Sequence, residues 1–327
     1  MKAVVITKPG NVDELQIQDI DEPKMPEGHV KIRTKAFGLN RAETYYRAGN
    51  FGEITEPRIP GIEAVGEVVE DKSGQFRTGQ KVITAMGGLM LARHGSYAEF
   101  VIAPASNVLA VETQLSWEEL AALPEAYLTA WGALDKNLAI QKGQSLLVRG
   151  GTTTLGLAAI TYAKAKGLTV VATTRNAANT ELLISKGADQ VIVDDGDIAE
   201  KIRALFPGGV DCALEVVGIA TIKDTLKAIK PFGQLCVVGV LTGPPVFENF
   251  NLMSDLPNTV QINFFSSGVF GTPEMSFADS PIQWIADQVE NKKIPSLISK
   301  VYEFDQIREA HQAMESNQIL GKAVVKL

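Results

Sequence analysis

Residues 148–158 read VRGGTTTLGLA, and this stretch decides the fold through what lies on either side of it. A buried-strand pattern, SLLV at 145–148, precedes it, and a helical pattern at 155–167 follows it. A second strand pattern, TVVATT at 169–174, comes at the interval that a βαβ unit needs. Gly150 and Gly156 stand six apart, the outer spacing of a GxxGxxG turn. The stretch therefore predicts a turn that holds the pyrophosphate of a dinucleotide.

Three threonines stand where this turn usually has its central glycine. Phosphate binding at a helix N-terminus depends on backbone N–H groups and the helix dipole, and neither requires glycine at every position. A threonine hydroxyl adds a further donor. We expect the pyrophosphate to bind at Gly150, Thr152, Thr153, Thr154, Leu155 and Gly156. The alternative is an ordinary strand-to-helix turn in which a threonine is only the N-cap.

The end of the second strand distinguishes NAD from NADP. An acidic residue there binds the 2′-hydroxyl of the adenosine ribose and repels a 2′-phosphate. This chain has Thr174 and Arg175 at that place and no carboxylate before Glu181. Because an arginine pairs with phosphate through two parallel hydrogen bonds, we expect NADP(H). The alternative is that Arg175 is a solvated charge at a strand end.

Outward from the turn, two kinds of pattern divide the chain. Strand and helix patterns alternate through the second half, which is typical of a parallel sheet covered on both faces. The first half reads as short strands broken by turn residues, which is typical of a compact barrel-like β domain. Ser116 and Glu119 form a capping box that begins a helix between the two regions. We expect one domain over 1–117 and 268–327, and a second over 118–267.

Composition excludes several classes of protein. The chain has 327 residues, of which 45% are hydrophobic, and no apolar run reaches the length of a membrane span. Its formal net charge of −7 argues against nucleic acid or anionic membrane as a partner. The N-terminus reads as a strand and not as a signal peptide, so we expect a cytoplasmic protein. Cys212 and Cys236 lie in apolar runs and are expected to be buried thiols in a reducing compartment.

Several further segments carry a family resemblance over nearly the whole chain. They are KAFGLNRAETYYRAG at 35–49, PGIEAVGEVVE at 60–70, GSYAEFV at 95–101, GVDCALEVVG at 209–218 and LGKAVVKL at 320–327. Together with the turn, they resemble the medium-chain dehydrogenase/reductase superfamily, in its zinc-free quinone oxidoreductase-like branch. The resemblance implies an α/β protein with a GroES-like β-barrel catalytic domain and a Rossmann domain, whose doubly wound parallel sheet binds the cofactor.

The chain departs from the zinc-dependent members of that superfamily. Those members carry a catalytic cysteine where this chain has Asn40, and a histidine where it has Ile62. Two cysteines cannot form the four-cysteine structural zinc lobe. His29, His94 and His311 show no ligand spacing and are expected at the surface or as capping residues. We therefore predict no bound metal.

Losing zinc changes the expected chemistry. Quinones and α,β-unsaturated carbonyls are already activated toward hydride, so the protein need only position the acceptor and donate hydrogen bonds to its oxygen. The resemblance places the substrate cleft between the domains, with Asn40, Glu43 and Tyr45 on its catalytic-domain side. Asn40 and Tyr45 are the expected catalytic residues, and Asn40 is expected to form a hydrogen bond with the substrate or with the nicotinamide ribose. Tyr45 is the candidate donor to the acceptor oxygen, and packing is its alternative role. Glu63 is expected to be a buried hydrogen-bond partner.

Further cofactor contacts follow from the resemblance and from the strand ends. Thr129 is expected beside the nicotinamide. Cofactors bind at the carboxyl edge of a parallel sheet, where Val238, Gly239 and Val240 end a strand. Phe265, with Phe264, is expected to form an apolar wall for the ring, and for Phe264 a core role is equally open.

The function that this predicts is NADPH-dependent reduction of a quinone or an enone. A carbonyl or enoyl-thioester reductase stays open, as does a low-turnover NADPH-binding sensor protein. The expected partner is a small-molecule substrate. By analogy with the family, we also expect a homodimer that joins its sheets through the strand at 259–267.

Overall fold

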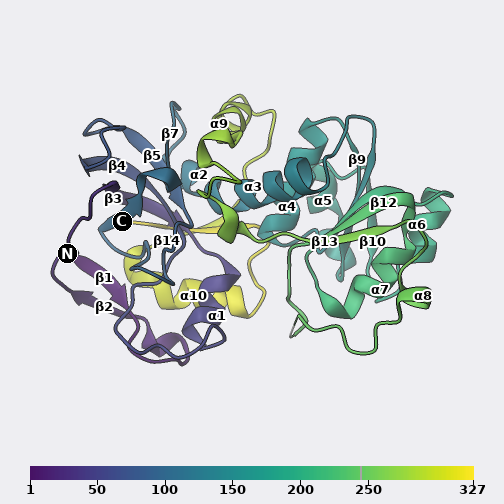
Figure 1. The fold of residues 1–327 in the computed structure, drawn as a ribbon, viewed down its shortest axis with the longest axis horizontal. Coiled ribbons are helices and arrows are strands. Elements are labelled where there is room, and N and C mark those ends of the chain that lie inside the picture. The colour runs from purple at the N-terminus through teal and green to yellow at the C-terminus, as the bar shows by residue number, and fades with distance from the viewer. Residues whose placement is uncertain (244) are drawn as a thin grey trace. The chain divides into compact units, whose positions relative to one another are not determined.

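The computed structural model describes residues 1–243 and 245–327. Contacts between residues divide the chain into two units (Figure 1). The first unit comprises Met1–Leu128, Ser267–Lys292 and Ser296–Leu327, and the second comprises Thr129–Ser266 and Lys293–Pro295. Among the described helices, none is both long enough and apolar enough to cross a membrane.

The second unit is built on a six-stranded parallel sheet in the order β10-β9-β8-β11-β12-β13. The strands are β8 (Ser145–Arg149), β9 (Thr169–Thr174), β10 (Gln190–Val193), β11 (Val210–Glu215), β12 (Ile229–Val237) and β13 (Gln261–Phe264). The chain runs from β8 outward to β10 and then crosses back to β11. This reversal of strand order between β8 and β11 marks the point where doubly wound sheets bind ligands, at the carboxyl ends of the strands.

Helices connect these strands and cover the sheet. They are α4 (Thr154–Ala165), α5 (Thr180–Ser185), α6 (Ala199–Leu205), α7 (Ile219–Lys227) and α8 (Leu252–Asp255). Helices α4 and α7 lie on opposite faces of the sheet (Figure 1). Strands β8 and β9 are buried over almost their whole length because both faces are covered, which is why their sequences read as continuous apolar runs. The predicted Rossmann-type sheet is confirmed.

The first unit contains a seven-stranded, largely antiparallel sheet and a two-stranded ribbon. The sheet order is β14-β15-β3-β4-β5-β7, with β6 paired to β3. The strands are β1 (Lys2–Val5), β2 (Gln16–Asp19), β3 (His29–Gly38), β4 (Glu63–Asp71), β5 (Lys81–Ala85), β6 (Phe100–Pro104), β7 (Val108–Ala110), β14 (Ile298–Glu303) and β15 (Lys322–Lys326). Strand β15, close to the C-terminus, pairs with β3, so the last segment of the chain completes the first unit.

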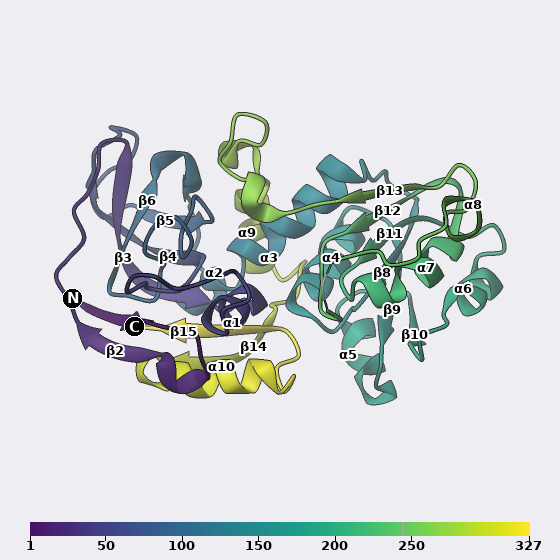
Figure 2. The ribbon, with the colours of Figure 1, turned by 60° about the horizontal axis from the view of Figure 1, so that its bottom comes forward.

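Five helices belong wholly or in part to the first unit. They are α1 (Arg41–Arg47), α2 (Trp117–Ala121), α3 (Pro124–Trp131), α9 (Ile282–Glu290) and α10 (Ile307–Glu315). Helix α10 contacts α1 and β15, which Figure 2 shows near it. The unit's core includes Ile32, Phe37, Tyr97 and Val325, which lie far apart in the sequence and are all fully buried.

The helical region that begins at Ser116 differs in detail from its sequence pattern. The capping box is present: the Ser116 hydroxyl accepts from the Glu119 N–H, and the Glu119 carboxylate accepts from the Ser116 N–H. The helix then stops at Ala121, and a second one begins at Pro124, where a proline is tolerated. Because α2 packs against β3 and β4, the first unit extends to Leu128, beyond the expected boundary at 117.

Candidate functional site

The turn between β8 and α4 requires its outer glycines. Gly150 has a φ of 93°, in the left-handed region that favours glycine. A Cβ at Gly156 would overlap the carbonyl oxygen of Gly150, and a Cβ at Gly151 would lie 3.0 Å from the carbonyl oxygen of Thr173. Helix α4 therefore approaches β8 as closely as a dinucleotide turn demands.

The three threonines of this turn have different roles. Thr153 is the N-cap of α4: its hydroxyl accepts from the Gly156 N–H at 2.9 Å and donates to the Gly150 carbonyl at 2.8 Å. That hydroxyl is therefore used within the turn. Thr152, Thr154 and Leu155 are half-buried at the start of α4. Within residues 1–243 and 245–327, the N–H groups of Thr152 and Leu155 find no acceptor, which leaves them to bind an anion.

The end of β9 presents a cation and no carboxylate of its own. Thr174 is buried, and its hydroxyl exchanges hydrogen bonds with the backbone of Asn176. Arg175 is exposed, and in the described part of the chain its guanidinium has no hydrogen-bond or ion-pair partner. A guanidinium with free donors at this strand end suits a phosphate.

The residues that follow β12 lie at the same edge of the sheet. The N–H groups of Val238 and Gly239 both donate to the carbonyl of Glu215 at the end of β11. A Cβ at Gly239 would overlap the carbonyl oxygen of Val216, so only glycine fits there. Val238, Gly239 and Val240 are half-buried, which leaves part of each accessible to a ligand.

Thr129 and Phe265 are both largely buried in the second unit, with exposed fractions of 9% and 8%. The Phe265 ring lies against Gly132, where any side chain would overlap it. Phe264, in contrast, is 64% exposed on strand β13. A core role for Phe264 is therefore wrong, because β13 is the edge strand of its sheet and that side chain faces outward.

In the first unit, the Asn40 amide is enclosed by charged groups. Its Nδ2 donates to Glu63 Oε1 at 2.8 Å and to Glu43 Oε1 at 3.3 Å. Its Oδ1 accepts from the Lys322 ammonium at 2.8 Å. Both amide hydrogens are thus used inside the unit. The expectation that Asn40 donates to a substrate does not fit this geometry, which leaves Asn40 as the link between two carboxylates and one ammonium.

Lys322 and Glu63 form an ion pair that is completely buried. The Lys322 Nζ lies 2.5 Å from Glu63 Oε1, and both side chains are inaccessible to solvent. The other Glu63 oxygen accepts from the Glu125 N–H at 2.7 Å. The buried role expected for Glu63 fits this arrangement. Lys322 is not among the predicted site residues, although a lysine within an apolar closing strand is a signal that a buried partner is needed.

Glu43 is completely buried, which does not fit the expectation that it lines the substrate cleft. It connects the ion pair to Tyr97, and these side chains together with Asn40 and His311 are called the Asn40 cluster. The Glu43 carboxylate accepts hydrogen bonds from the Asn40 N–H at 2.5 Å, the Ile62 N–H at 3.1 Å and the Tyr97 hydroxyl at 2.9 Å. Burial raises the pKa of Glu43 to about 7, although these hydrogen bonds and the Lys322 charge oppose the rise. Glu43 therefore changes its protonation state near neutral pH.

His311 ends this chain of contacts. Its Nε2 lies 3.1 Å from the Tyr97 hydroxyl, and the ring is fully buried on α10. Burial lowers the pKa of His311 to about 3, helped by the nearby Arg47 charge, so the imidazole is neutral. The expectation of a surface or capping role for His311 is wrong, because α10 turns this residue into the core of the first unit.

Tyr45 stands beside this cluster on α1. It is half-buried, and the described residues offer its hydroxyl no hydrogen-bond partner. Glu43 and Asn40 form a capping box at the start of α1, so the cluster fixes the helix that carries Tyr45. A phenol with a free donor on a fixed helix is suited to bind a carbonyl oxygen.

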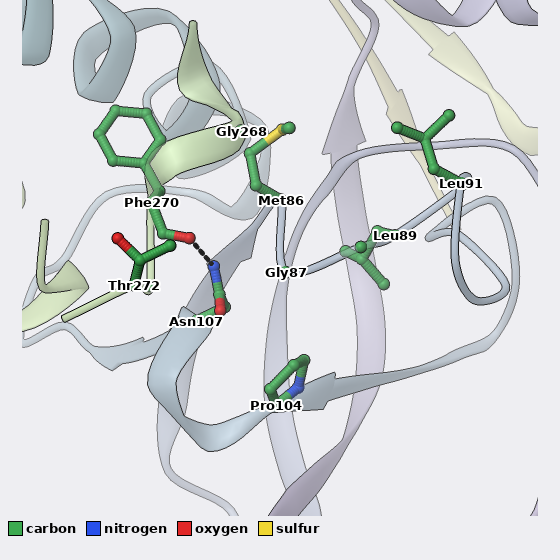
Figure 3. Close-up of a pocket in the computed structure, with 11 residues that line it drawn as sticks. Met86, Gly87, Leu89, Leu91, Pro104, Asn107, Gly268, Phe270 and Thr272 are labelled. Atoms are coloured by element: carbon green, nitrogen blue, oxygen red, sulfur yellow. Dashed lines mark hydrogen bonds between the residues drawn. The ribbon is translucent and has the colours of Figure 1, made fainter. Parts of the chain in front are cut away.

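A pocket of about 330 Å³ opens elsewhere in the first unit (Figure 3). Its lining is mainly apolar, from Met86, Leu89, Leu91 and Phe270, and none of the predicted site residues contributes to it. The Asn107 amide donates to the Phe270 carbonyl at 3.0 Å, as Figure 3 shows. The same amide nitrogen donates to the Ala85 carbonyl at the end of β5, so Asn107 links the segment around Phe270 to that strand.

Metal ligands are not grouped in the described structure. Apart from residue 244, which lies outside it, no three His, Cys, Asp or Glu side chains are placed to hold a metal ion. The two cysteines are buried, as predicted. Burial raises the pKa of the Cys212 thiol to about 11 and that of Cys236 to about 12, so both stay protonated.

Two family descriptions match the chain. The alcohol dehydrogenase GroES-like domain matches residues 26–113, and the zinc-binding dehydrogenase family matches residues 154–279. The first match lies within the unit that contains the Asn40 cluster, and the second begins at α4. Both halves of the predicted superfamily architecture are therefore matched independently.

Individual proteins resemble the chain along its whole length. A quinone oxidoreductase of Lama guanicoe is 26% identical, covering 100% of this chain and 98% of that protein. The mycobacterial protein Rv1454c, solved in complex with NADPH, has 26% identity and a TM-score of 0.88, with 100% of both chains covered. The Escherichia coli quinone oxidoreductase, also solved with NADPH, has 22% identity, a TM-score of 0.89 and full coverage of both chains, and at that identity it shows the fold alone.

Proposed function

Since this chain belongs to the medium-chain dehydrogenase/reductase superfamily, in its quinone oxidoreductase-like branch, we propose that it reduces a quinone or an α,β-unsaturated carbonyl with NADPH and without zinc. The observation that carries the proposal is that Asn40, which stands where the resemblance puts a zinc-ligating cysteine, is held inside the first unit by Glu63 and the Lys322 ammonium. NADPH would supply the hydride.

A zinc ion does not fit the side chains at this place. Zinc in proteins takes cysteine, histidine and carboxylate ligands, and Ile62 and Asn40 stand at two of the expected ligand positions. Both carboxylate oxygens of Glu63 are already used. Oε1 accepts hydrogen bonds from Lys322 and Asn40, and Oε2 accepts one from the Glu125 N–H. A second cation there would face the ammonium at close range. The reaction therefore calls for a hydride acceptor that needs no Lewis acid, which favours quinones and enones over simple aldehydes and ketones.

The cofactor turn supports NADPH as the donor. The free N–H groups of Thr152 and Leu155, at the positive end of the α4 dipole, suit a pyrophosphate. Arg175 supplies a cation for the 2′-phosphate at the end of β9. Val238, Gly239, Val240 and Thr129 complete the proposed cofactor contacts, and Phe265 supports them from the interior.

Tyr45 is the proposed catalytic residue of the first unit. Its hydroxyl donates to the oxygen of the acceptor, where negative charge develops as hydride arrives. Asn40 acts through Glu43 and the start of α1, and is a positioning residue because its own donors are used. The proton that completes the reduction comes from solvent.

The protein is further proposed to act as a homodimer. Strand β13 has β12 as its only partner in the described sheet, so its other edge is unpaired, and Phe264 is exposed on it. An unpaired apolar edge strand is a pairing surface that proteins usually cover. Pairing of two copies along β13 would cover both the unpaired strand edge and the exposed Phe264 side chain.

Steady-state assays of NADPH oxidation test the proposed activity. We expect turnover with quinones or enones, little with simple aldehydes, a preference for NADPH over NADH, and no effect of a metal chelator. Tyr45→Phe should lower kcat by roughly 100-fold while NADPH affinity stays the same, because only a transition-state hydrogen bond is lost. Tyr46→Phe, in the next position on α1, is the matched control.

Three results would contradict the proposal. Loss of activity on chelation would mean that a metal takes part. Tight NADPH binding without turnover on quinones, enones, aldehydes or enoyl thioesters would indicate a sensor protein. Turnover confined to enoyl thioesters or simple carbonyls would show that these compounds, and not quinones or enones, are the substrate class.

A further inference from the structure

Arg149 is the most completely buried cation of the second unit. It ends strand β8, directly before the phosphate-binding turn, and its side chain is inaccessible to solvent. Its Nε and Nη2 donate to the two oxygens of Asp194 at 2.8 Å each, and its Nη1 donates to Asp224 at 2.7 Å. Nη2 also donates to the Gly196 carbonyl, and Nη1 also donates to the Thr221 carbonyl and the Thr225 hydroxyl. All of the guanidinium's hydrogen-bonding capacity is therefore used.

Asp194 lies next to the strand end that distinguishes the two dinucleotides. It follows β10, the strand next to β9, and its N–H donates to the Thr174 carbonyl at 2.8 Å. Its Oδ2 lies 3.4 Å from the Thr173 hydroxyl, which accepts from the Gly150 N–H at 3.1 Å. Thus β9 itself ends without a carboxylate, but the neighbouring strand brings one to the same edge of the sheet.

That carboxylate is ionised at neutral pH. Burial alone would raise the pKa of Asp194, but the hydrogen bonds and charge of Arg149 outweigh burial and hold the pKa below its usual value. A negative charge beside the end of the second strand would repel a 2′-phosphate, as an acidic residue at that strand end does in proteins that select NAD. Arg149 provides the opposite charge through two parallel hydrogen bonds, the strongest form of such a pair.

We propose that Arg149 is a specificity-determining residue for the dinucleotide, because it cancels the charge of Asp194 and so allows Arg175 to bind a 2′-phosphate. The inference rests on the proposed use of NADPH. The two arginines have different roles at this edge of the sheet. Arg175 attracts the 2′-phosphate directly, whereas Arg149 weakens the repulsion between Asp194 and the 2′-phosphate without contacting the ligand.

A purely structural role makes a different prediction. Arg149 also joins β8 to α7 and to the segment after β10, so its loss would disturb the turn that binds the pyrophosphate. NADH and NADPH share that pyrophosphate, and a disturbed turn would weaken both by the same factor. Only the charge of Asp194 acts selectively on the dinucleotide with the extra phosphate. The ratio of the two dissociation constants therefore distinguishes the roles.

The experiment measures the Kd of NADPH and of NADH by calorimetry on the full chain. Asp194→Asn removes one negative charge from this edge of the sheet and leaves Arg149 paired with Asp224, and it should increase the preference for NADPH by roughly tenfold, the effect of one unit charge near a phosphate. Arg149→Met should decrease the preference by a similar factor. Adding Asp194→Asn to Arg149→Met should restore it. The single asparagine variant retains the guanidinium, so it serves if Arg149→Met does not fold.

Asp211→Asn is the matched control. Asp211 is also a carboxylate of the second unit that is paired with a cation, Lys230, but it lies near the amino end of β11, away from the edge where cofactors bind. Its substitution should leave the ratio unchanged.

The results that overturn the inference differ from those that overturn the proposed function. If Asp194→Asn leaves the ratio of dissociation constants as in the unsubstituted protein, the inference is wrong, even though NADPH binds. If the unsubstituted protein binds neither dinucleotide, the proposed function fails and the inference fails with it.

Discussion

Glu43 makes the pH dependence of stability a direct test of the buried cluster. Its carboxyl has a pKa of about 7 in the folded protein, against an ordinary value of 4.5. A carboxyl whose pKa is raised on folding stabilises the protein below the unfolded value, and this contribution is lost as pH rises through the folded value. The difference corresponds to roughly 3 kcal/mol in full, of which about 2.5 kcal/mol falls between about pH 5 and about pH 8.

His311 acts in the opposite direction. Its pKa falls from 6.5 to about 3 on folding, so the unfolded chain binds the proton more readily below 6.5 and stability declines as pH falls. Between about pH 5 and about pH 8, the contribution of His311 to the free energy of unfolding rises by roughly 2 kcal/mol, whereas that of Glu43 falls. The two contributions nearly cancel in the unsubstituted protein. In Glu43→Gln only that of His311 remains, so the free energy of unfolding should rise by about 2 kcal/mol from pH 5 to pH 8.

Urea denaturation followed by fluorescence, at intervals between about pH 5 and about pH 8, measures this directly. Glu53→Gln, which removes an exposed carboxylate from the same unit, is the control and should follow the unsubstituted protein. A constant offset in Glu43→Gln is expected, because the new amide donates where the carboxylate accepts. Parallel pH profiles for Glu43→Gln and the unsubstituted protein would refute the reasoning, since Glu43 would then titrate alike in the folded and unfolded states.

Three further predictions concern single side chains. Lys322→Met should lower the free energy of unfolding by about 3–5 kcal/mol in urea denaturation because it leaves Glu63 buried and unpaired, and adding Glu63→Gln should recover more than half of the loss. Gly156→Ala should lower stability by about 1–3 kcal/mol and raise the Kd of NADPH, because its Cβ overlaps the Gly150 carbonyl; Gly208→Ala, where a Cβ meets open space, should do neither. Arg175→Ala should raise the Kd of NADPH by roughly 10- to 100-fold in calorimetry and leave that of NADH almost unchanged, and an equal effect on both would exclude a phosphate contact.

Local patterns in the sequence are enough to predict the elements and the cofactor turn. The spacing of Gly150 and Gly156, the buried strand before them and the helix after them lie within one βαβ unit. The capping box at Ser116 lies within four consecutive residues. These features follow from neighbouring residues because backbone sterics and helix capping act over one or two turns of chain. That Asn40 and Ile62 stand at the positions of zinc ligands is implied by the family resemblance and not by a local pattern.

Tertiary structure alone decides what the buried charges do. Lys322 meets Asn40 across 282 positions of sequence, and Arg149 meets Asp194 across 45. The sequence around either cation does not predict its partner, because the pairing depends on which strands become neighbours in a sheet. An isolated charge in a protein interior is too costly to leave unpaired, so the folds that bury Lys322 and Arg149 must also bring carboxylates to them. The sequence therefore determines the elements, whereas the order of the strands determines which charges meet.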